Sequence, residues 1–256
     1  MTKALIGYTG FVGSHLLCQQ HFDDCFNSAN IDTIDGKSYD LVVCAGVPAA
    51  KWIANRDPVK DRANIQQLTR HLRTIKADKF VLVSTVDVYP VPVGVDEDSS
   101  IDMATCEPYG KHRLELEHFV ADCFDACIVR LPGLFGRGLK KNVIYDFLHD
   151  NNVNLINPKG VFQFYSLEHL THDINVALQN DLDLINITSE PLTVEEVAHV
   201  CLGDEFVNTI DQPGVQYDYL SRYAHLFGGQ NGYLYSKEQV LADLQAYVTE
   251  ERKHVR

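Results

Sequence analysis

The 256-residue chain has few cations and no long apolar run. Its 22 lysines and arginines stand against 35 acidic residues, so the net charge is −13. A nucleic-acid-binding protein usually carries a basic stripe, and the lack of one argues against nucleic acid as a partner. Apolar runs stay well short of the roughly 20 residues that span a bilayer, and no secretion signal is recognisable. We therefore expect a cytoplasmic protein that does not enter a membrane.

Cysteine is also used sparingly and without pattern. The seven cysteines include no CxxC pair, and their odd number does not suit a disulfide framework. Cys123 and Cys127 are four residues apart, but a metal site needs more ligands than this pair supplies. We therefore expect no metal and a reducing compartment. Apolar residues make up 45% of the chain, enough for a sizeable core.

Glycines interrupt an apolar pattern near the start of the chain. The run Ala4–Ile6 is typical of a buried strand, and a helical pattern begins near Phe11. Glycines at this junction let the backbone approach a pyrophosphate, whose charge is stabilised by the helix N-terminus. A structural glycine turn is the alternative. We predict a dinucleotide site formed by Gly7, Thr9, Gly10, Phe11, Val12 and Gly13.

Strand and helix patterns alternate over the first ~135 residues, which indicates a parallel sheet covered on both faces. We predict an α/β fold with a Rossmann-type doubly wound sheet over residues 1–135, the dinucleotide-binding domain. Residues 136–256 are expected to form a smaller α+β lobe for the substrate, with part of 160–190 packing back on the first domain. A ligand would then lie at the carboxyl ends of the strands.

Two further segments are expected to contact the cofactor. The second strand ends at Asn27 or Ser28, where NAD sites place an acidic residue and NADP sites have an arginine nearby. Because both residues are uncharged, the choice between NAD and NADP stays open. The strand around residues 41–43 runs into Cys44, Ala45 and Gly46, small residues that would pass under the cofactor.

Thr85, Tyr109 and Arg113 are the candidate catalytic residues. Thr85 ends a predicted strand, and Tyr109 opens a helix over residues 109–124, with Arg113 on the same face and Glu117 on the outer side. A tyrosine base at neutral pH needs its pKa lowered by about 3 from about 10. One cation about 4 Å away supplies roughly the required 4 kcal/mol. The alternative is a buried aromatic residue beside a surface cation.

These motifs resemble those of the extended short-chain dehydrogenases/reductases, the NAD-dependent epimerase/dehydratase group. The resemblance covers nearly the whole chain and rests on the three spaced glycines, the small turn after Val43, Asn64, residues 85–89 (TVDVY), 108–110 (PYG), 130–136 (RLPGLFG), 165–170 and 186–189. It implies NAD or NADP as cofactor, Thr85 and Tyr109 as catalytic residues, and Asn64 and Arg113 beside the cofactor. It also implies a nucleotide-linked sugar as substrate and a homodimer formed through the helix at Tyr109.

The chain departs from the family pattern at two places. Arg113 stands where the family has lysine, and a guanidinium cannot copy a compact ammonium. The second strand is short and lacks its acidic residue. In addition, Val86 and Asp87 replace the Asp-Glu pair of the sugar dehydratases, which argues against dehydration.

The substrate side is marked by a cationic cluster. By the resemblance, Arg137, Lys140, Lys141 and Asn142 would bind the pyrophosphate of a nucleotide sugar; an exposed basic loop is the alternative. The sequence thus predicts an NAD(P)-dependent oxidoreductase or epimerase that acts on a nucleotide-linked or related sugar. The alternative function is a non-catalytic NAD(P)-binding sensor or scaffold protein of the same fold.

Overall fold

The computed structural model describes residues 1–203 and 205–254 and divides into two compact units. The first unit contains Met1–Val91, Asp98–Arg130 and Glu168–Ile185. The second contains Pro92–Glu97, Leu131–Leu167 and Asn186–Arg256. The units therefore alternate along the sequence, whereas the predicted domains are continuous ranges.

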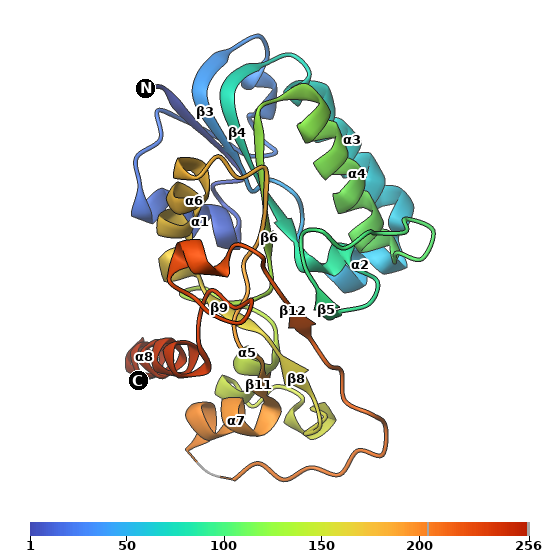
Figure 1. The fold of residues 1–256 in the computed structure, drawn as a ribbon, viewed down its shortest axis with the longest axis vertical. Coiled ribbons are helices and arrows are strands. Elements are labelled where there is room, and N and C mark those ends of the chain that lie inside the picture. Colours follow the sequence, from blue (N-terminus) through green and yellow to red (C-terminus); the bar gives the residue numbers. More distant parts are fainter. Residues whose placement is uncertain (204, 255–256) are drawn as a thin grey trace. The chain divides into compact units, whose positions relative to one another are not determined.

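A six-stranded parallel sheet forms the first unit, in the order β2-β1-β3-β4-β6-β10 (Figure 1). Its strands are β1 (Lys3–Ile6), β2 (Asp24–Phe26), β3 (Ser38–Cys44), β4 (Lys76–Thr85), β6 (Ala126–Leu131) and β10 (Leu184–Asn186). In the register of the first three strands, Leu5 pairs with Cys25 on one side and with Val43 on the other. The chain reverses direction across the sheet between β2 and β3, which makes the carboxyl end of β1 the switch point where ligands bind in such folds. The predicted Rossmann-type fold is confirmed.

Helices cover both faces of this sheet. Figure 1 shows α3 (Pro58–Leu72) and α4 (Pro108–Cys123) side by side on one face, and α1 (Phe11–Gln19) and α6 (Leu170–Gln179) on the other. The covered strands are buried on both faces, which explains their unbroken apolar runs. Among the residues that the structure describes, no helix is both long and apolar enough to cross a membrane.

One helix is shorter than its sequence pattern indicates, and another precedes it. The pattern predicts a helix over residues 57–76, whereas α3 covers Pro58–Leu72 and an unpredicted short helix, α2 (Lys51–Arg56), lies before it. Asp57 lies between them and caps α3, because its carboxylate accepts the N–H of Lys60 and proline follows at the first helical position. At the other end, β4 already begins at Lys76, where it pairs with Ser38 of β3.

The second unit is an assembly of short strand pairs and helices, the α+β composition expected from the sequence. Thr193 and Glu196 form a capping box at the start of α7 (Val194–Leu202), and Ser236 and Gln239 bond reciprocally at the start of α8 (Lys237–His254). The strand pairs are β7 (Gly133–Phe135) with β9 (Phe164–Ser166), β8 (Val161–Phe162) with β11 (Leu192–Thr193), and β5 (Val93–Val95) with β12 (Asp218–Tyr219). The helices are α5 (Val143–Leu148), α7 (Val194–Leu202) and α8 (Lys237–His254), and short 3-10 turns join the elements.

Glu117 is buried, although the helical pattern places it on the outer side of α4. Its carboxylate binds the Arg130 guanidinium of β6 through contacts of 2.6 to 3.2 Å, and Arg130 also donates to the Tyr89 hydroxyl. Glu117 is 1% exposed and Arg130 5%. The prediction that Glu117 lies on the outer side was wrong. Its charge is stabilised inside the protein by Arg130, which belongs to a strand that follows the helix in the sequence and was not recognised as its partner.

Because of this ion pair, we expect substitution of Glu117 to lower the free energy of unfolding much more than substitution of the neighbouring Glu115. Glu117→Gln leaves the Arg130 charge buried without its counter-ion and should lower the free energy of unfolding by about 3–5 kcal/mol. Glu115→Gln breaks the surface pair with Arg62 and should cost about 1 kcal/mol or less. Urea unfolding followed by circular dichroism measures both, and equal losses would contradict the assignment.

Candidate active site

The glycine loop after β1 is shaped by contacts that leave no room for side chains. Gly7 has φ +88°, and a Cβ atom there would lie 2.4 Å from the carbonyl oxygen of Ala45. A Cβ atom on Gly13 would lie 2.1 Å from the carbonyl oxygen of Gly7, so α1 packs directly on the loop. Gly10 is exposed at the start of α1. The loop therefore holds the N–H groups of the first turn of α1 in the position from which helix N-termini bind phosphates.

The end of β2 is joined to this loop. Gly7 donates its N–H to the carbonyl of Phe26 at 2.7 Å, and the Asn27 side-chain amide donates to the Tyr8 hydroxyl at 3.2 Å. Asn27 also accepts the N–H of Ala29, and Ser28 is exposed. Both residues are uncharged hydrogen-bonding groups at the position that reads the cofactor ribose in such folds, so the choice between NAD and NADP stays open.

The small residues after β3 pack against the loop from the other side. Ala45 donates its N–H to the carbonyl of Ile6, and a Cβ atom on Gly46 would lie 2.9 Å from the Ile6 side chain. Cys44 is fully buried, and its burial raises the pKa of the thiol to about 11. Cys44 is therefore part of the core, and contacts of Cys44, Ala45 and Gly46 with a cofactor stay predictions.

The remaining predicted cofactor residues have different surroundings. Thr9 is exposed, Phe11 and Val12 are half-buried, and the Phe11 ring meets the His15 ring edge to face at 5.4 Å. Asn64 is exposed on α3, whereas Asp61 one turn earlier is buried. Their contacts with a cofactor stay predictions.

Thr85 and Tyr109 are brought together. Thr85 ends β4, and its hydroxyl oxygen accepts the N–H of Asp87 at 3.1 Å. The same hydroxyl lies close enough to the Tyr109 phenol, at the start of α4, to lower the pKa of that phenol. Glycine at 110 allows this contact, because a Cβ atom there would lie 2.2 Å from the carbonyl oxygen of Asp87. The arrangement places a proton-transfer group and an oxygen-orienting group at the carboxyl end of a central strand.

Arg113 stacks on Tyr109 but is bound elsewhere. Its guanidinium carbon lies 3.9 Å from the centre of the Tyr109 ring. Its two terminal nitrogens lie 2.6 and 2.9 Å from the oxygens of Asp61, and it donates to the Pro48 carbonyl at 2.6 Å. His112 contacts the same carboxylate through Nδ1 at 2.7 Å. Arg113 is thus part of a buried ion pair that ties α4 to α3 and to the segment after β3.

Arg113 does not lower the pKa of Tyr109 below its ordinary value, as the sequence spacing suggested. Burial raises the pKa of the phenol, and this effect exceeds the lowering by Arg113 and by the Thr85 hydrogen bond. Arg113 still has the largest lowering effect on this pKa, but the loss of water around the buried phenol opposes it and is larger. In this structure, the phenol is therefore held in its protonated form at neutral pH.

Asp61 and His112 are members of the site that sequence reasoning missed. Asp61 lies on the apolar face of α3 with Ile65 and Leu68, at spacings of four and seven residues. An acidic residue on an apolar helix face needs a cation as partner. That signal was present in the sequence, but it did not identify Arg113 as the partner.

The predicted substrate residues lie in the second unit. Arg137, Lys140 and Lys141 are exposed before α5. Asn142 instead caps this helix, because its side-chain oxygen accepts the N–H of Tyr145 and its amide donates to the carbonyl of Leu134. The prediction of Asn142 as a substrate ligand is thereby weakened, since both ends of its side chain serve the fold.

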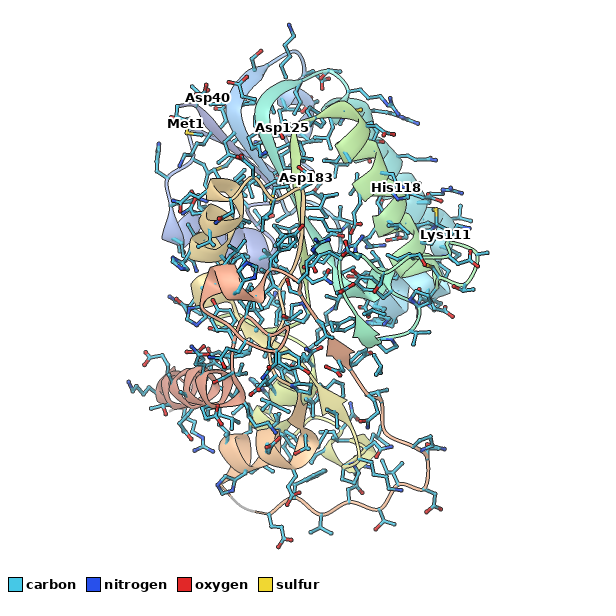
Figure 2. The ribbon with its side chains drawn as sticks, viewed as in Figure 1. Met1, Asp40, Lys111, His118, Asp125 and Asp183 are labelled. Carbon is cyan, nitrogen blue, oxygen red and sulfur yellow. The ribbon has the colours of Figure 1, made fainter. Side chains whose placement is uncertain are left out.

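Three aspartates of the first unit lie away from the glycine loop. Figure 2 shows Asp40, Asp125 and Asp183 with Met1 at the edge of the sheet where the strands begin. Asp125 forms an ion pair of 2.7 Å with Lys79. Because the strands are parallel, this edge is opposite to the glycine loop, and its carboxylates do not crowd an anionic ligand there.

Comparison with known families decides the classification. The model of the NAD dependent epimerase/dehydratase family matches residues 18–155, more than half of the chain. The chain belongs to this family. A comparison with curated protein sequences found no match.

Solved structures share the fold over nearly the whole chain. A UDP-glucose 4-epimerase from Thermotoga maritima, solved with UDP-glucose, has 15% identity, a TM-score of 0.76 and full coverage of both chains. RMD from Pseudomonas aeruginosa, complexed with NADPH, has 16% identity and a TM-score of 0.70 over 96% of this chain and 99% of the other. A dTDP-4-dehydrorhamnose reductase from Clostridium acetobutylicum has 15% identity and a TM-score of 0.75 over 98% and 100%. At these identities the similarity shows the epimerase/reductase fold.

The Asp61–Arg113 pair predicts a pH-dependent contribution to stability. Burial would raise the pKa of Asp61, but hydrogen bonds from Arg113 and His112 hold it below its ordinary value. A lowered pKa in the folded state stabilises the protein above the unfolded pKa of about 4, and this stabilisation is lost as the pH falls further. Asp61→Asn should therefore cost about 3–5 kcal/mol at neutral pH and progressively less below about pH 4.

Urea unfolding at a series of pH values measures this cost. Asp32→Asn, at an exposed position, is the control and should have a small effect throughout. A cost of Asp61→Asn that stays constant down to about pH 2 would show that the ion pair does not set the stability.

Proposed function

We propose that this chain is an NAD(P)-dependent oxidoreductase or epimerase that acts on a nucleotide-linked or related sugar. The observation that carries the proposal is the placement of the buried Tyr109 at the start of α4 beside Thr85 at the end of β4, where Gly110 packs on the carbonyl of Asp87, in the same unit as the glycine loop. Membership of the family supports it, as do structural neighbours solved with NADPH and with UDP-glucose.

The glycine loop fits a dinucleotide. A Cβ atom at Gly7 or Gly13 would collide with backbone, so the chain holds a bare turn beside the first turn of α1, and Gly10 leaves its approach open. Backbone N–H groups at this position would hold the pyrophosphate. Asn27 and Ser28 would meet the ribose, and Ala45 and Gly46 would lie beneath the cofactor. When bound, NAD or NADP supplies the hydride acceptor or donor of the reaction.

Tyr109 and Thr85 divide the remaining chemistry. The Tyr109 phenol would take a proton from a sugar hydroxyl or return one to a carbonyl oxygen. Thr85 would donate to the same substrate oxygen and fix its position. Because the pKa of Tyr109 is raised, the resting phenol is ready to act as an acid, the direction that reduction of a carbonyl requires.

The proposed substrate class, a nucleotide-linked sugar, is argued from a cluster of positive charges in the second unit. Arg137, Lys140 and Lys141 are exposed cations in a chain of net charge −13, and cations attract the pyrophosphate of a nucleotide sugar. The acidic pair that the resemblance requires for dehydration is incomplete, since Val86 occupies its first position. A homodimer formed through α4 and a cytoplasmic location stay predictions.

A non-catalytic NAD(P)-binding protein is the second candidate function. The observation that favours it is the commitment of Arg113 to Asp61 and Pro48, where the family has a lysine. Such a protein would bind the cofactor without hydride transfer. Cofactor binding therefore tests the assignment of the glycine loop, and hydride transfer separates the two functions.

Gly10→Asp should abolish cofactor binding without unfolding the protein. A side chain at this exposed position has one close contact, 3.3 Å from the carbonyl oxygen of Gly7, and its carboxylate would repel the pyrophosphate. For the unchanged protein, a cofactor at about 100 times its Kd adds roughly 2.7 kcal/mol and raises Tm by several degrees. Thermal unfolding with NAD, NADH, NADP and NADPH measures this shift and shows which cofactor is preferred.

Gln67→Glu, which adds the same charge on the exposed side of α3, is the matched control and should keep the full shift. Two results would contradict the proposal. The absence of a shift with all four cofactors rejects an NAD(P)-dependent function, and an undiminished shift in Gly10→Asp rejects the loop as the binding site.

A further inference from the structure

A tyrosine of the glycine loop contacts the residue that follows β2. Tyr8 comes directly after Gly7, and its hydroxyl accepts the side-chain N–H of Asn27 at 3.2 Å. Asn27 is the first residue after β2, and the loop is joined to the same strand because Gly7 donates its N–H to the carbonyl of Phe26. In Rossmann-type folds the adenosine ribose of a dinucleotide is bound at this position. The Tyr8 hydroxyl thus lies where a ribose-binding group is needed.

The hydrogen bonds of the turn after β2 leave this task to Tyr8. The side-chain oxygen of Asn27 accepts the N–H of Ala29 at 2.8 Å, and its amide donates to Tyr8. Asn30 holds the turn, because its side chain accepts the N–H of Asn27 at 2.7 Å and donates to the carbonyl of Cys25 at 3.0 Å. Among the residues that the structure describes, the Tyr8 hydroxyl accepts one hydrogen bond and donates none. Its proton can therefore be donated to a ligand oxygen.

The elements around this position carry almost no positive charge. Between Lys3 and Lys51 the sequence contains one lysine and no arginine. This segment forms β1, the glycine loop, α1, β2, β3 and the turn after β3. Its lysine, Lys37, is bound to the Asp24 carboxylate at 3.0 Å and lies over the Phe26 ring. A phosphate on the adenosine ribose would therefore meet no arginine and no unpaired lysine in this part of the chain.

We propose that this site selects NAD over NADP, with the Tyr8 hydroxyl donating to the 2′-hydroxyl of the adenosine ribose. The inference rests on the proposed function, since it requires that the glycine loop binds a dinucleotide. NADP carries a phosphate at that hydroxyl, and the negative charge of a phosphate needs cations that this segment does not supply. Asp32, exposed in the 3-10 turn that follows, adds a like charge instead. Tyr8 thus takes the place of the acidic residue by which NAD sites bind this hydroxyl.

The test is the binding of NAD and NADP to the full-length protein, measured by calorimetry without a sugar. NAD should bind about 30-fold tighter than NADP or more, because a charged group left without a partner costs more than a lost neutral hydrogen bond. Tyr8→Phe keeps the ring and removes the hydroxyl. It should weaken NAD binding about 5- to 10-fold and leave NADP binding nearly unchanged. NAD that lacks the 2′-hydroxyl should bind equally to the unchanged protein and to Tyr8→Phe, since neither pair can form the bond.

Tyr39→Phe is the matched control. The Tyr39 hydroxyl donates to Asp24, at the other end of β2, at 2.6 Å, so its loss should change neither affinity. Equal affinities or a preference for NADP would overturn the inference, and so would a preference for NAD that Tyr8→Phe leaves intact. If neither cofactor binds, the proposed function is rejected and this inference with it. If both bind equally and Gly10→Asp abolishes both, the glycine loop is the binding site and only the selectivity is rejected.

Discussion

The ion pair between Arg113 and Asp61 is the interaction on which the site depends. It joins α4 to α3, and the bond from Arg113 to the Pro48 carbonyl joins both helices to the segment after β3. The glycine loop packs against the same segment through Ala45. Removing either charge would leave the other buried, at a cost of several kcal/mol. The pair therefore holds the first turn of α4, and with it the phenol, in place relative to the strand ends.

The role of Arg113 differs from the one that its spacing suggested. A cation stacked on a phenol lowers its pKa, and Arg113 does so for Tyr109, but burial of the phenol raises the pKa by more. Arg113 therefore stabilises the fold through Asp61 without bringing the pKa of Tyr109 below its ordinary value.

Local patterns predicted the parts of the site that depend on local structure. The strand, the glycines and α1 follow one another in the sequence, so the loop could be derived from residues 4–17 alone. The family motifs predicted Thr85 and Tyr109 as partners, and their catalytic roles stay predictions. The burial of Asp61 and Glu117 could not be predicted, because the cation that pairs with each carboxylate lies on a different element. Helix α2 was missed because six residues carry too little periodicity.

Hydride transfer is the measurement that tests the central claim most directly. The protein with bound NAD is mixed with UDP-glucose, UDP-galactose and dTDP-linked hexoses, and the fluorescence of reduced nicotinamide is followed over a single turnover. The account predicts a signal with at least one of these sugars in the unchanged protein and none in Tyr109→Phe, which should still bind NAD. An equal signal in Tyr109→Phe would contradict the role of the phenol, and no signal in either protein would favour the non-catalytic function.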